Sequence, residues 1–330
     1  MHGYIVRRLA YMVVVFLMVA VVTFTIIQLP PGDYVTQLIA DMRIRGMEVD
    51  EDAEIALRQQ YGLDRPLWQQ FLAWFGDLVQ GDFGRSFQYQ QPVSKLIGER
   101  LALSIGISIL TLLFTYLLAV PIGIYSATHQ YSMTDYAFTV FGFVGLATPN
   151  FLLALILMFV FLKYFGINPG GLFSAEFVFA PWNAAKVIDL VKHLPIPLIV
   201  IGTAGTAGII RVMRGSLLDE LKRQYVITAR AKGLGESQLL FKYPLRVALN
   251  PIVSTVGWLL PAIVSGETIT AVVLTLPTVG PLLLQSLMAQ DMQLAASMVM
   301  FLTVLTVIGT FVSDLVLVLV DPRIRYEKRV

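Results

Sequence analysis

Between two long apolar runs the chain carries a basic segment, residues 211–251. Its centre reads Tyr225-Val226-Ile227-Thr228-Ala229-Arg230-Ala231-Lys232-Gly233-Leu234. The whole chain is 56% hydrophobic and only 14% charged. Charge that is concentrated in one internal loop of such a chain indicates a docking surface. The partner that docks there then determines what the protein does.

Composition places the chain among membrane proteins, with a mean hydropathy of +0.72. Six apolar windows each approach the roughly 20 residues that cross the ~30 Å apolar core of a bilayer. Backbone groups in lipid must be hydrogen bonded within their own element, so each window predicts a helix. The first window exceeds the apolar core of a signal peptide, and we expect it to be retained. The windows are 9–29, 103–125, 137–162, 194–213, 252–275 and 296–320.

The segments between these windows differ in charge. The loop 211–246 carries eight basic residues against three acidic ones, and the tail 321–330 is also basic. Because loops rich in Lys and Arg stay in the cytoplasm, both termini and the basic loop are predicted to be cytoplasmic. The opposite segments are acidic or nearly balanced: 30–100, 163–193 and 267–293.

We therefore expect an all-α polytopic protein with six transmembrane helices in three parts. These are an N-terminal tail with the first helix (1–29), an external or periplasmic segment (30–100) and a transmembrane core (101–330) that includes the loop 211–246.

The external segment is too long to be a simple connector. Asp50 is placed to cap one helix, and Pro66 is placed to open a second. Trp68 and Trp74 suit a helix at the membrane interface. The segment serves as a cap packed on the bundle, as a surface for a partner, or as both. The apolar face predicted for the second helix consists of Leu67, Phe71, Trp74, Phe75 and Leu78.

Motifs for catalysis and for nucleotide binding are missing from the sequence. There is no Cys, and the three His residues are scattered, so no metal site is predicted. Lys232-Gly233 lacks the upstream glycine and the following Ser or Thr of a phosphate-binding loop. A membrane-embedded hydrolase is disfavoured because no paired catalytic groups are found. The chain is expected not to be an enzyme, so its energy comes from a gradient or from another polypeptide.

An ion-coupled transporter would carry charges inside the membrane and inverted repeats. Glu267 and Asp314 are marginal candidates for such charges, and no clear repeat is found. Gly202, Gly205 and Gly208 make the fourth predicted helix slim. Close helix packing explains this by default. The alternative is a wall of the translocation pathway, for which the candidates are Gly205, Gly208 and Glu267.

The basic loop itself predicts two short helices. Residues 219–232 lack Pro and Gly and should be helical. Gly233 can end that helix in a left-handed conformation, and 235–237 can start the next. Small Ala229 and Ala231 allow another protein to approach closely. A solvated basic loop on anionic lipid is the alternative.

These residues resemble permease subunits of binding-protein-dependent ABC importers, specifically the first-permease type of the dipeptide, oligopeptide and nickel branch. Further matching motifs follow in order along essentially all 330 residues. They are Arg7-Arg8-Leu9, Pro31-Gly32-Asp33, Tyr61-Gly62-Leu63-Asp64-Arg65-Pro66, Gly81-Asp82-Phe83-Gly84, Pro92-Val93, Leu245-Arg246, Asn250-Pro251 and Asp321-Pro322-Arg323-Ile324-Arg325.

The resemblance implies a type I importer fold in the bacterial inner membrane. The implied partners are a paralogous second permease, two ABC ATPase subunits (or one used twice) and a periplasmic or lipid-anchored binding protein, with membrane lipid around them and no nucleic acid. ATP and Mg would be bound in the ATPases, with no cofactor in this chain. The implied solute is a peptide or a similar small polar molecule. The ATPase-coupling residues it implies are Tyr225, Thr228, Ala229, Arg230, Ala231, Lys232, Gly233, Leu234 and Leu245.

The sequence departs from the family pattern at three places. Ile227 replaces a frequent Glu, Arg246 replaces a frequent Pro, and Tyr243-Pro244 replaces the His-Ala of many branch members. The last departure weakens the match to the best-known dipeptide systems, but it leaves the docking role in place.

Overall fold

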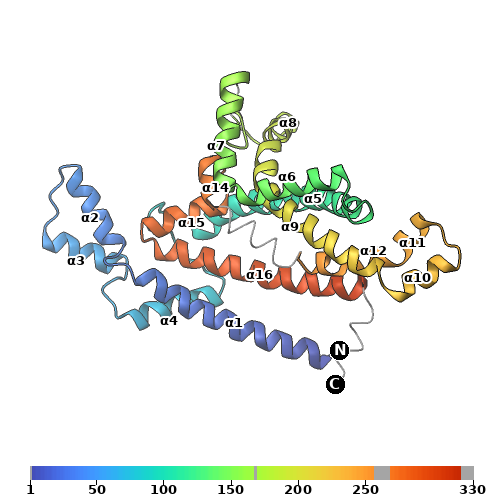
Figure 1. The fold of residues 1–330 in the computed structure, drawn as a ribbon. Coiled ribbons are helices and arrows are strands. Elements are labelled where there is room, and N and C mark those ends of the chain that lie inside the picture. The colour runs from blue at the N-terminus through green and yellow to red at the C-terminus, as the bar shows by residue number, and fades with distance from the viewer. Residues whose placement is uncertain (1, 167–168, 256–267, 321–330) are drawn as a thin grey trace. The chain divides into compact units, whose positions relative to one another are not determined.

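The computed structural model describes residues 2–166, 169–255 and 268–320. Every regular element in these ranges is a helix, which confirms the predicted helical class. The chain forms two compact units, 1–104 with 278–307 and 105–277 with 308–330. Figure 1 labels the helices. Their bounds are α1 His2–Gln28, α2 Tyr34–Ile44, α3 Glu51–Gln60, α4 Leu67–Val79, α5 Val93–Thr128, α6 Met133–Ala147, α7 Asn150–Val160, a π-helical turn η1 Phe161–Phe165, α8 Ala184–His193, α9 Pro195–Leu221, α10 Gln224–Ala231, α11 Glu236–Lys242, α12 Pro244–Ala248, α14 Thr268–Val273, α15 Val279–Met288 and α16 Met292–Val320.

Three of the described helices are long and apolar enough to cross a membrane. They are α1, α5 and α16, which match the first, second and last predicted windows. Two bent pairs pass the same test, and they match the third and fourth windows: Met133–Ala147 with Asn150–Phe165, and Ala184–Thr203 with Gly205–Leu221. The middle half of the fifth window, 252–275, lies outside the described residues.

The third window is not the single straight helix that we predicted. Its two halves meet at an angle of 101°. Thr148 lies between them in an extended conformation, with φ −88° and ψ 118°, and Pro149 follows. A proline disfavours helical conformation in the residue before it, so the helix ends there and restarts in a new direction.

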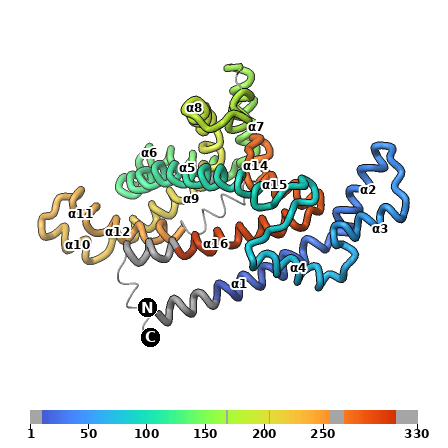
Figure 2. The backbone as a smooth tube through the Cα atoms, turned by 180° about the vertical axis from the view of Figure 1, so that it is seen from behind, coloured from blue at the N-terminus to red at the C-terminus, as the bar shows by residue number. Residues whose placement is uncertain are grey.

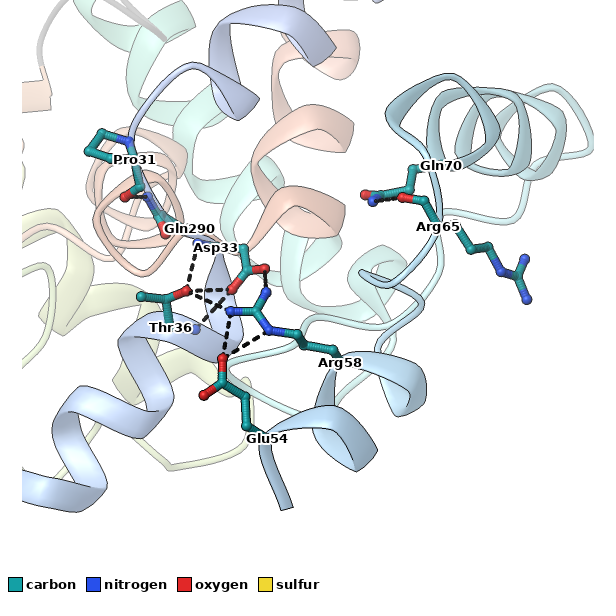
Figure 3. A network of polar contacts seen from close by, with 8 residues as sticks. All are labelled: Pro31, Asp33, Thr36, Glu54, Arg58, Arg65, Gln70 and Gln290. Atoms are coloured by element: carbon teal, nitrogen blue, oxygen red, sulfur yellow. Dashed lines mark hydrogen bonds and ion pairs between the residues drawn. The ribbon is translucent and has the colours of Figure 1, made fainter. Parts of the chain in front are cut away.

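In the first unit, residues 33–60 form a helical hairpin that is held by polar contacts (Figure 3). Asp33 caps α2 in a reciprocal capping box with Thr36. Arg58 of α3 donates to Asp33 and Thr36, and it also pairs with Glu54 one turn earlier. Asp50 caps α3 as predicted, accepting from the Ala53 amide at 3.0 Å.

A buried carboxylate joins the segment after α4 to the start of α16. Asp291 is fully buried. It accepts hydrogen bonds from the Ser86 hydroxyl at 2.5 Å and from the Gln88 amide at 3.0 Å. Its other oxygen caps α16 at the Leu294 amide, at 3.2 Å. One side chain thus fixes the turn 84–92 against the helix that begins beside it.

The second unit is organised around α9, which packs against α5 and α6. Gly123 of α5 lies so close to Met213 that an added Cβ would fall 2.6 Å from the Met213 Cβ. An added Cβ at Gly202 would likewise fall 2.9 Å from Cδ1 of Phe114. Arg214 binds Asp135, which is 2% exposed, through two hydrogen bonds of 3.1 and 2.9 Å. Small residues and one bidentate ion pair therefore set the helix spacing.

Candidate functional site

The basic loop folds as two short helices, α10 and α11, which follow α9 (Figure 1). We predicted one continuous helix over 219–232, and this is wrong in one detail. The chain leaves the helix at Arg223, where φ is −69° and ψ is 145°, and α10 starts at Gln224. The resulting change of direction lets α10 fold back on α11 and bury an apolar face that a straight extension of α9 would leave exposed.

The helix pair has a small apolar core of its own. Val226, Ala229 and Leu239 are buried in it, and Leu234 and Tyr243 pack around them. The small side chain of Ala229 therefore serves contact between α10 and α11, whereas the sequence suggested that it serves contact with a partner. This core joins the two helices into one packed unit.

Gly233 makes the bend between the helices, as predicted. Its φ is +82°, in the left-handed region that favours glycine. The Gly233 amide bonds to the Arg230 carbonyl at 3.0 Å, and the Leu234 amide bonds to the Ala229 carbonyl at 3.4 Å. These bonds satisfy carbonyls at the end of α10. The second helix starts at Glu236, also as predicted.

An ion pair spans the bend on the solvent side. Arg230 donates two hydrogen bonds to Glu236, at 2.6 and 3.0 Å. This bonding lowers the pKa of Glu236 and raises the pKa of Arg230 relative to their ordinary values. Both side chains are well exposed, at 68% and 47%, so the pair is screened by water and contributes little stability.

The chain after the pair is anchored in the second unit's core. Leu245 and Ala248 of α12 are buried together with Met213 and Leu217 of α9. Leu245, which the sequence grouped with the docking residues, is therefore an internal anchor. Movement of the helix pair would be transmitted through α12 to α9.

The outward surface of the pair is mixed in character. Tyr225 and Ile227 of α10 and Phe241 of α11 are exposed apolar side chains. Thr228, Arg230, Ala231 and Lys232 are also exposed. Figure 2 shows the pair extending beyond α12. Exposed apolar side chains among cations are typical of a surface that another protein covers.

Two of the candidate pathway residues, Gly205 and Gly208, lie one turn apart on α9. An added Cβ at Gly205 would meet Thr115 at 3.5 Å, which supports the packing interpretation there. At Gly208, no side chain or backbone atom of the described residues lies within 4 Å of an added Cβ. Glu267 lies outside the described residues.

Sequence reasoning missed one hollow in the second unit, a cavity of about 1060 Å³ beside α8. Phe161, Phe173 and Phe177 line it together with charged side chains of Glu176, Lys192 and His193. No periodic or local signal in the sequence marks it, because its walls come from α8, η1 and an irregular loop. Within the described ranges, no group of three or more His, Cys, Asp or Glu residues is arranged to hold a metal ion.

The chain matches known protein families over most of its length. Residues 119–326 match the family described as binding-protein-dependent transport system inner membrane component. The chain belongs to this family. Residues 1–108 match the N-terminal membrane-component domain of the same transport systems. The chain is therefore a multi-pass permease component of the inner membrane, and the helix pair α10–α11 lies within the family's matched core.

Relatives align over nearly the full length. The oligopeptide transport system permease protein AppB of Bacillus subtilis (strain 168) is 35% identical over 327 residues, covering 99% of this chain and 100% of the relative. The di/tripeptide transport system permease protein DppB of Pseudomonas aeruginosa (strain UCBPP-PA14) is 29% identical, with 99% and 100% coverage. The dipeptide transport system permease protein DppB of Escherichia coli (strain K12) is 27% identical, again with 99% and 100% coverage.

A solved structure shares the fold. It is an inward-facing form of the MetNI methionine ABC transporter, with a TM-score of 0.52 and 14% identity. The match covers 68% of this chain and 96% of the compared chain. At this identity the likeness concerns the fold alone.

Proposed function

We propose that the chain is the permease subunit of an ATP-driven peptide importer and forms half of its translocation pathway. The observation that carries this is alignment over nearly the whole chain with permeases whose names specify oligopeptide, di/tripeptide and dipeptide transport. A gradient-driven carrier, the alternative from the sequence, has no support from these relatives.

The helix pair α10–α11 is the proposed contact with an ATPase subunit. It is rigid, it carries exposed apolar and cationic side chains, and it is tied to α9 through α12. ATP and Mg would be bound by that separate subunit. Closure of two such subunits around ATP would push the pair and, through α12, rotate α9. A paralogous permease would complete the pathway.

The charge pattern gives the proposed orientation. Both termini and the loop 211–246 face the cytoplasm, and residues 30–100 lie outside the membrane on the opposite side. A binding protein would deliver the peptide there.

Subunit association tests the docking assignment. We expect Ala231→Trp to detach the ATPase subunits from the purified complex, because Ala231 is exposed on α10 and a large ring there blocks close approach. Ala56→Trp is the matched control, since Ala56 is an exposed alanine on a helix of the other unit. The measurement is the amount of ATPase that co-purifies with each variant. Equal retention in both variants would refute docking at this surface.

A further inference from the structure

Helix α4 presents three different faces. Its buried face is formed by Trp74 and Leu78, which are 3% and 7% exposed. A second face carries apolar side chains at helical spacing, and among them Phe75 packs partly against the buried cluster. Trp68, Leu72 and Val79 are 62%, 58% and 67% exposed, and half-buried Phe75 falls on the same line. We call Trp68, Leu72, Phe75 and Val79 the α4 stripe. The third face is polar or small: Gln69, Ala73, Gly76 and Asp77.

The buried face fixes α4 against helices that cross the membrane. Trp74 and Leu78 share one cluster with Ala20 and Phe24 of α1 and with Met292, Ala296 and Met300 of α16. The Phe24 ring lies 5.3 Å from Phe71 and 6.1 Å from Trp74. These α1 and α16 residues all fall inside the spans Tyr11–Gln28 and Met292–Phe311.

The depth of that cluster can be estimated from helix geometry. From Met292 to Met300, α16 rises by about 12 Å, and from Ala20 to Gln28, α1 rises by about the same amount. One leaflet contributes about half of the ~30 Å apolar core. The residues that hold α4 therefore lie in the outermost turns of two apolar spans, within a rise that fits inside one leaflet.

Helix α1 also has exposed apolar side chains. Val14, Met18 and Val22 of α1 are all about half exposed or more, as lipid-facing residues of a spanning helix are. At the entry to α4, charged Asp64 and Arg65 lie four and three residues before Trp68. A tryptophan next to charged residues at a helix end is typical of the membrane–water interface.

We infer that the α4 stripe lies against the acyl chains of the membrane, so that α4 is a partly embedded helix whose polar face meets water or headgroups. In the proposed orientation this is the outer leaflet. The contact ties the segment 30–100 to the membrane surface at a fixed height beside α1. The packing of α4 on the apolar spans of α1 and α16 carries the inference, which does not depend on what the protein transports.

Spin labelling of the assembled transporter in liposomes tests this. The chain has no cysteine, so each single-cysteine variant carries one label in this subunit. The unmodified complex, treated with the same label, measures the signal from cysteines of the partner subunits. Trp68→Cys, Leu72→Cys and Val79→Cys report on the stripe. Gln69→Cys and Ala73→Cys are the matched controls on the polar face of the same helix. Retained uptake of solute shows that each labelled complex is folded.

Collision rates with oxygen and with a water-soluble nickel chelate distinguish the environments. We expect an oxygen-to-nickel ratio several-fold higher on the stripe than at the two control positions. A ratio on the stripe equal to that at the controls would show that the stripe faces water and would overturn the inference. Immobilised labels that neither reagent reaches would show a protein partner on the stripe and would also overturn it.

Discussion

Gly233 combines a φ of +82° with open space around its missing Cβ. A side chain there would strain the backbone without clashing with a neighbour. Left-handed conformation costs an ordinary residue about 1–2 kcal/mol, whereas Asn tolerates it well. We expect Gly233→Val to weaken ATPase stimulation by the loaded binding protein, because the bend between α10 and α11 is disfavoured.

Gly233→Asn is the control for this substitution. It adds a side chain of similar size but keeps the left-handed conformation accessible, so its ATPase stimulation should stay close to that of the unmodified complex. Equal loss in both variants would mean that the space around residue 233 matters and that its conformation does not.

At the scale of elements, the α10–α11 pair is held by apolar burial and not by its ion pair. Leu239 is 1% exposed in the pair's core, and truncating a buried Leu costs at least about 2 kcal/mol. We expect Leu239→Ala to loosen the pair, raise its cleavage by added protease and reduce ATPase retention. Glu236→Gln should change none of these at neutral pH, since Arg230–Glu236 is exposed.

The sign of the pH effect follows from the lowered pKa of Glu236. A carboxyl group with a depressed folded-state pKa stabilises the fold above its ordinary pKa, and this contribution is lost as pH falls through the folded-state value. The small contribution of the ion pair should therefore be present at neutral pH and be lost in acid, where Glu236 is protonated. Loosening by Glu236→Gln at neutral pH, with no effect of Leu239→Ala, would contradict this ranking.

Local signals in the sequence predicted local structure. Asp50 capped its helix, Gly233 took the left-handed bend, and the two helices after Pro66 and Gly235 began where expected. Each signal acts within one turn of helix, so no knowledge of the rest of the fold is needed to interpret it.

Features that depend on distant packing were not predictable in this way. The break at Arg223 exists because α10 packs on α11, and Ala229 is buried for the same reason. Asp291 binds Ser86, which lies far away in the sequence. On α4, Leu67 was assigned to the buried face but is 55% exposed. Periodicity indicates that a helix is amphipathic, but it does not say which neighbour covers each face.

At the scale of the whole molecule, the central claim is that energy enters through another polypeptide. This claim is our proposal, and it is supported by the alignment with permeases of peptide transport systems. The helix pair α10–α11 offers an exposed and partly apolar surface for the proposed energy-supplying subunit.

The most direct test is peptide uptake into liposomes that contain the assembled transporter and external loaded binding protein. Uptake should require ATP at the ATPase side, persist when ionophores collapse every ion gradient, and stop when the ATPase subunits are omitted. Uptake that proceeds without ATPase subunits and disappears with the gradient would contradict the account.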